Sequence, residues 1–265
     1  ASPVTEARGI PIAAAGVVFE DVTSPASWTW PAHAALFTGL PPWENGARHN
    51  PDPKGLNSDE PADVVLPMRV DRPTFAGQLK EAGYETVAIS ANGWLHADLG
   101  LTRGFDRVDR VQRDLDVTEA VEALVPSERE QPLLLFLNYM GAHAPYELTP
   151  APWVQGRMPE LTGDSPAQWV EPYLMSERPG LNLYLAAGEG DSSGFEAYMR
   201  GDLQIPPEGL KLLRDLYESE VAVLERHLSR VISAWTSRYP SGVVVLTSDH
   251  GEYLGDHYMV GKGNL

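Results

Sequence analysis

The chain lacks cysteine altogether over its 265 residues. It therefore has no disulfide bonds and offers no thiolate to a metal or a substrate. Positive charge is scarce as well, because 20 Lys and Arg stand against 37 Asp and Glu, for a formal net charge of −17. Nucleic-acid phosphates are bound by basic surfaces, so this balance argues against a nucleic-acid partner. No apolar run is long enough to span a bilayer, and we predict no membrane segment in this chain.

The residues that are present predict an α/β fold. Hydrophobic residues make up 43% of the chain and charged residues 22%, which is typical of a folded globular domain. Predicted strands alternate with predicted helices, and this alternation favours a mainly parallel sheet flanked by helices on both faces. The strands are expected at 16–22, 85–90, 133–139 and 243–248, and the helices at 31–38, 73–82, 117–124 and 207–235.

The most informative stretch runs from Ser24 to Gly39. It places Thr29 just ahead of Pro31, which is tolerated in a first helical turn because its missing N–H would be unpaired there. Exposed amides and the helix dipole favour negative charge at such a terminus, so the Thr29 hydroxyl is a candidate nucleophile. The alternative is an ordinary capping threonine.

A second stretch, from Gly242 to Ser248, predicts a buried strand, and Asp249 and His250 follow it directly. A carboxylate and an imidazole at the carboxyl end of a strand can bind a divalent metal, and open α/β sheets bind their ligands at that edge. A polar turn is the alternative for these two residues.

Together the two stretches resemble the sulfatase family of the alkaline phosphatase superfamily, whose nucleophile motif is Cys/Ser-x-Pro-x-Arg. Here Thr29, Pro31 and His33 occupy its fixed positions. Further family landmarks follow in order, at Gly16–Phe19, Leu79–Thr86, Gly104–Asp106 and His143–Tyr146. The resemblance implies one sulfatase-like catalytic α/β domain over 1–265, with a pocket-shaping insertion around 147–201.

The resemblance also implies roles for individual residues. Asp249 and His250 would bind a divalent metal; the family favours calcium, and magnesium, manganese and zinc stay open. His143 would contact the ester or protonate the leaving group, with His257 as a second proton donor. Lys262 would hold the anionic ester, unless it is simply solvated. The substrate expected from these roles is a small anionic ester.

Departures from the family pattern bear on the chemistry. Thr29 cannot become the formylglycine that sulfatases make from cysteine or serine, and this moves the expectation toward phosphate esters without excluding sulfate. His33 stands in place of the motif arginine, where it either steadies the Thr29 oxygen or lies on the helix surface. No aspartate pair precedes Thr29, and we therefore expect the chain to be a fragment of a longer sulfatase-like protein.

Three functions follow from these observations. The first is metal-dependent hydrolysis of sulfate or phosphate esters through a covalent Thr29 intermediate. The second is transfer of the phospho group to an alcohol. The third is a catalytically inactive relative that binds anionic glycans or proteins. Nothing in the sequence predicts the compartment or the oligomeric state.

Overall fold

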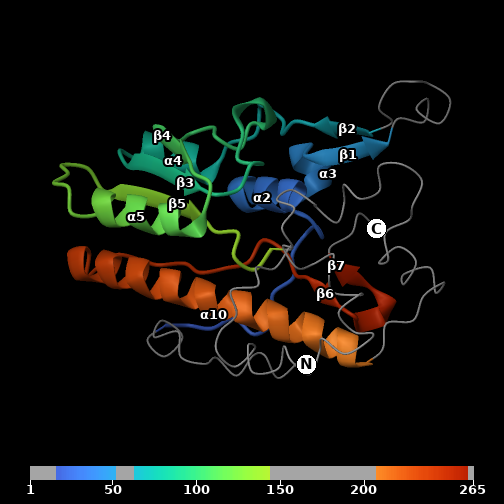
Figure 1. The fold of residues 1–265 in the computed structure, drawn as a ribbon. Helices are drawn as coiled ribbons and strands as arrows, with labels where there is room; N and C mark the ends of the chain where they lie inside the picture. Colours follow the sequence, from blue (N-terminus) through green and yellow to red (C-terminus); the bar gives the residue numbers. More distant parts are fainter. Residues whose placement is uncertain (1–15, 52–62, 144–206, 262–265) are drawn as a thin grey trace. The chain divides into compact units, whose positions relative to one another are not determined.

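The computed structural model describes residues 16–51, 63–143 and 207–261 (Figure 1). The chain divides into two compact units. The first comprises residues 1–139, 229–251 and 263–265, and the second comprises 140–228 and 252–262. The predicted insertion at 147–201 lies outside the described residues, and so does Lys262. No helix within the described ranges is both long and apolar enough to cross a membrane.

The sheet of the first unit is parallel, as predicted. Its order is β4 (Arg107–Arg110), β3 (Glu85–Ser90), β5 (Leu133–Asn138). Ser90 pairs with Asn138, so the carboxyl ends of β3 and β5 lie at the same edge. The apolar, partly β-branched sequence of β3 explains why this central strand is buried.

Alternate residues of a strand point to opposite sides of the sheet, so β3 has apolar side chains on both faces. Helices cover both of these faces. On one face, Ala88 packs with residues of α2 (Thr29–Thr38), including Phe37. On the other face, Val87 and Ile89 pack against α5 (Asp114–Leu124) and the C-terminal part of α10 (Pro207–Arg238). Figure 1 shows α5 lying along the sheet. The predicted fold class is therefore confirmed.

The other described elements are short. The first unit adds α3 (Pro42–Asn45), α4 (Phe75–Glu81), the 3₁₀ turn η3 (Ala97–Leu99) and an antiparallel pair, β1 (Arg48–Pro51) with β2 (Asp63–Leu66). The second unit adds the antiparallel pair β6 (Tyr253–Leu254) and β7 (Val260–Gly261), with the 3₁₀ turn η5 (Asp256–Tyr258).

Two predicted strands, at 16–22 and 243–248, are wrong. Both segments are irregular, and Val17, Phe19, Val243 and Val245 are 78–82% exposed. A β-strand needs a neighbour to complete its ladder of backbone hydrogen bonds, and no strand of the described residues pairs with either segment. Apolar, β-branched sequence alone is therefore not enough to form a strand here.

Candidate active site

Thr29 is the first residue of α2, so it lies at the predicted helix N-terminus, although the helix begins two residues before its predicted start at Pro31. The preceding residue, Trp28, occupies the N-cap position, and Gly39 ends the helix in a left-handed conformation with φ of 67°. Thr29 is therefore not the capping residue, and its role as a nucleophile stays a prediction. Its side chain is buried, with 4% of the residue exposed.

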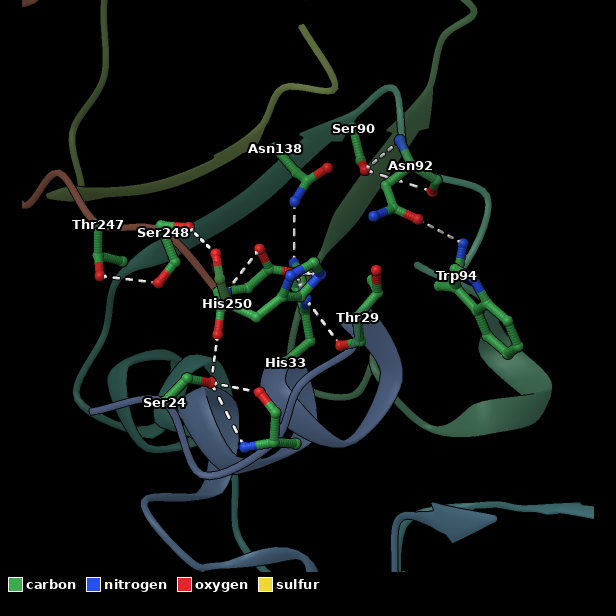
Figure 2. Close-up of polar contacts among 12 residues, drawn as sticks. Ser24, Thr29, His33, Ser90, Asn92, Trp94, Asn138, Thr247, Ser248 and His250 are labelled. Atoms are coloured by element: carbon green, nitrogen blue, oxygen red, sulfur yellow. Dashed lines mark hydrogen bonds and ion pairs between the residues drawn. The ribbon is translucent and has the colours of Figure 1, made fainter. Parts of the chain in front are cut away.

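His33 lies one helical turn after Thr29 and is only 3% exposed, so it is not a surface histidine. Its Nδ1 atom lies 3.0 Å from the main-chain oxygen of Thr29 and 3.3 Å from Oδ2 of Asp249. Its Nε2 atom lies 2.9 Å from Nδ2 of Asn138, at the end of β5. Figure 2 shows the ring at the centre of these contacts. His33 thus joins the first turn of α2 to the predicted metal ligand, and it contacts the main-chain oxygen of Thr29.

Asp249 and His250 are adjacent and contact each other. The main-chain N–H of His250 donates to Oδ1 of Asp249 over 3.0 Å, and Nε2 of His250 lies 3.4 Å from Oδ2. Burial alone raises the pKa of the Asp249 carboxyl. The hydrogen bond from His33 and the electrostatic influence of both histidines outweigh burial, so the pKa lies below its usual value. Asp249 is therefore ionised at neutral pH.

These two side chains suit a cation. Nδ1 of His250 lies 2.8 Å from the main-chain oxygen of Gly251, which can only accept a hydrogen bond, so Nδ1 carries a proton. Nε2 of the same ring faces Oδ2 of Asp249, and the two atoms lie 3.4 Å apart. A proton or a cation near both atoms would link the imidazole to the carboxylate. Among the described residues no three His, Asp or Glu side chains form a metal-binding group, so this pair would supply only part of a coordination shell.

The remaining predicted site residues belong to the second unit. His143 follows β5 and is the last described residue before the undescribed segment. His257 lies in η5 with φ of 55°, a left-handed conformation that is uncommon for a residue with a side chain. Lys262 lies just beyond the described residues. The roles of these three residues stay predictions.

Two polar residues of the first unit were not identified from the sequence. Ser24 donates through Oγ to the main-chain oxygen of Asp249 over 2.5 Å, which fixes the backbone beside the predicted metal ligand. The side-chain amide nitrogen of Asn138 lies within hydrogen-bond distance of Nε2 of His33. Asn138 ends an apolar strand as a polar residue, the same signal that identified Asp249, whereas the contact of Ser24 has no signal in the sequence.

The N-terminal end of α2 also meets the loop that follows β3. The rings of Trp28 and Trp94 pack edge to face, with centroids 5.5 Å apart. Trp94 is 37% exposed, and its main-chain N–H donates to Oδ1 of Asn92 over 2.9 Å. This contact places the β3 loop beside the residue that precedes Thr29.

The fold and this site define an α/β protein in which His33 of α2 and Asp249 meet Asn138 at the end of a parallel strand, the usual ligand-binding edge of such sheets. The chain belongs to the sulfatase family, whose profile matches residues 11–264. This match confirms the resemblance predicted from the sequence.

Individual relatives are distant. Over 95% of the chain, it is 23% identical to a Δ4,5-hexuronate-2-O-sulfatase of Bacteroides thetaiotaomicron. Over 80% of the chain, it is 22% identical to the multifunctional alkaline phosphatase superfamily protein PehA of Trinickia caryophylli. The chain covers 52% and 44% of these two relatives, about half of their lengths.

A solved structure supports the fold assignment. The chain superposes with a TM-score of 0.58 on a protein solved in complex with its substrate, D-glucosamine-2-N,6-O-disulfate. The two are 16% identical, and the match covers 91% of this chain and 60% of that one. At this identity the likeness concerns the fold alone.

Proposed function

We propose that the protein carrying this chain is a metal-dependent hydrolase of sulfate esters that uses Thr29 as its nucleophile. The observation that carries the proposal is the position of His33. One buried imidazole contacts both the first turn of α2 and the carboxylate of Asp249. The same imidazole therefore lies against the backbone of the candidate nucleophile and against the candidate metal ligand.

In the proposed reaction the Thr29 hydroxyl gives its proton to water and Oγ attacks the sulfur of the ester. The bond between sulfur and the leaving-group oxygen breaks, and that oxygen takes a proton from His143 or His257, which regains one from water. A second water molecule then attacks the sulfur of the sulfo-threonine; one of its protons goes to Oγ of Thr29, the other goes to solvent, and sulfate leaves. This second step is an ester hydrolysis, because threonine cannot expel sulfate by collapsing to an aldehyde.

Asp249 and His250 would hold the divalent metal, with calcium as the first ion to test. When bound, the metal lowers the pKa of a hydroxyl and neutralises the ester oxygens. The ionised carboxylate of Asp249 supports this role. Lys262 would contact the anionic group of the ester. The name of one relative, a Δ4,5-hexuronate-2-O-sulfatase, supports sulfate as the group removed and favours a sulfated sugar as the substrate class.

The test measures turnover of an aryl sulfate by the full-length protein, with added calcium and after chelation. Thr29→Ala should lower kcat by about a thousandfold or more, because nothing else supplies the attacking oxygen. Thr38→Ala is the matched control: it removes a hydroxyl from the last turn of the same helix and should leave turnover within about twofold. Turnover that survives Thr29→Ala would remove Thr29 from the nucleophile role.

Phosphate esters are the second candidate substrate, favoured by the threonine itself. A threonine alkoxide attacks phosphorus directly, and one distant relative is named as a multifunctional alkaline phosphatase superfamily protein. An aryl phosphodiester assayed beside the aryl sulfate decides between the two. Added alcohols would reveal transfer instead of hydrolysis. A protein that binds no divalent metal and turns over neither ester would be an inactive, binding relative.

A further inference from the structure

We propose that Asn138 is a positioning residue that holds the His33 imidazole so that Nδ1 faces the main-chain oxygen of Thr29 and the carboxylate of Asp249. The importance of Asp249 rests on the proposed function, whereas the hydrogen-bond geometry does not. The inference follows from the two ring nitrogens of His33, which face partners of opposite hydrogen-bonding character.

The Nδ1 side of the ring faces acceptors only. The main-chain oxygen of Thr29 lies at 3.0 Å and the carboxylate oxygen of Asp249 at 3.3 Å. A carbonyl oxygen cannot donate a hydrogen bond, so Nδ1 carries the proton and donates it to the Thr29 oxygen. Oδ2 of Asp249 lies near the same nitrogen.

The Nε2 side of the ring faces a donor. The amide nitrogen of Asn138 lies 2.9 Å from Nε2 and donates to its lone pair (Figure 2). The contact matches a neutral ring protonated on Nδ1, because the hydrogen bond at one ring nitrogen sets the state of the other. Asn138 comes from β5 and His33 from α2, so the sheet edge fixes the angle of a ring on the neighbouring helix.

The rest of the Asn138 amide indicates that it does not serve stability alone. Its Oδ1 atom is buried and has no hydrogen-bond partner in the part of the chain that the structure describes. A buried polar atom left unpaired is unfavourable, and a leucine at this position would not have that atom. The benefit of the asparagine therefore lies in its bond to His33. Through that bond it constrains the carboxylate of Asp249.

The experiment is a two-bond ¹H–¹⁵N correlation spectrum of the histidine rings in the full-length, metal-free protein. The spectrum is recorded at a pH above the ordinary histidine pKa of about 6.5. The chain has 7 histidines. The ring signals of His33 are assigned as those that disappear in the His33→Gln variant. We expect a proton on Nδ1 and an unprotonated Nε2. A proton on Nε2 in the natural protein would overturn the proposal, and this result needs no variant.

Asn138→Leu supplies the second arm, with Asn92→Leu as control. Asn92 is also a buried asparagine that follows a strand of the same sheet, and its Oδ1 accepts from Trp94. We expect the slowly exchanging Nδ1–H signal of His33 to be lost in Asn138→Leu and kept in Asn92→Leu. A signal that persists unchanged in folded Asn138→Leu would contradict a positioning role.

Metal affinity separates this proposal from the proposed function. If Asp249 binds the metal, Asn138→Leu should weaken calcium binding about tenfold, the usual effect of losing an outer-shell partner. If calcium binding is unchanged in the variant, Asn138 does not act on Asp249 and the proposal fails. If the natural protein binds no divalent metal, the proposed function fails, and the ring spectra still decide whether Asn138 holds His33.

Discussion

Gly104→Ala is expected to be among the most destabilising single changes in the first unit. Gly104 has φ of 91°, and a Cβ atom added there would lie 2.2 Å from the backbone nitrogen of Gly77 and 2.6 Å from its Cα. Both atoms belong to the backbone of α4, so no side-chain rotation can relieve the contact. This close approach places α4 against the turn that leads into β4. The Oγ1 hydroxyl of Thr86 stabilises the turn by donating to the main-chain oxygen of Gly104 over 2.7 Å.

The magnitude has two parts. A left-handed backbone costs a residue with a Cβ about 1–2 kcal/mol, and forcing the backbones of α4 and the turn apart adds about 1–3 kcal/mol or more. The sum, about 2–5 kcal/mol, is a large fraction of the roughly 5–15 kcal/mol that stabilises a typical domain.

Gly83→Ala is the matched control for this prediction. Gly83 has the same φ of 91° but nothing within 4 Å of its added Cβ, so it should show only the backbone cost of about 1–2 kcal/mol. The assay is urea unfolding of both variants and the natural protein, with the free energies compared at equal m-values. Equal losses in the two variants would refute the argument that backbone contact makes Gly104 special.

Three further predictions concern the same unit. Lys80 and Thr86 hold the pKa of Asp106 below its usual value, so the ion pair stabilises the fold above the unfolded-state pKa of about 4 and is lost as the pH falls through the folded pKa. In Asp106→Asn the deficit in unfolding free energy against the natural protein should therefore be larger at neutral pH than in acid. Phe37→Ala should cost about 3–5 kcal/mol in urea unfolding, because the fully buried ring packs against three other phenylalanines. Arg230→Ala should leave the urea midpoint of unfolding close to that of the natural protein, because its bidentate pair with Glu122 is exposed to solvent and such pairs contribute little. A clear drop in the midpoint would mean that the pair supports the packing of α10 on α5.

The elements that the sequence predicts well are those with local signals. β3 matches its predicted bounds, and β5 ends one residue before the predicted limit. α5 begins at Asp114, three residues before the predicted start, because the carboxylate of Asp116 accepts the main-chain N–H of Arg113 ahead of the apolar pattern. Such polar signals at helix starts are easily missed when apolar spacing is followed alone.

The errors arise where structure depends on distant partners. The segments 16–22 and 243–248 have strand-like sequences but no neighbouring strand among the described residues. At the site, Thr29, Asp249 and His250 are visible as motifs, whereas the link from Asn138 through His33 to Asp249 joins residues up to 216 positions apart, from 33 to 249. No local pattern encodes that distance.

The most direct test of the proposed mechanism is to trap the covalent intermediate. The full-length protein is mixed with an aryl sulfate, quenched in acid within a single turnover and digested, and the peptides are analysed by mass spectrometry. The account predicts one sulfo group on the peptide containing Thr29, absent from Thr29→Ala and present in Thr38→Ala. A sulfo group on another residue, or turnover of the ester with no modified peptide at any time, would contradict it.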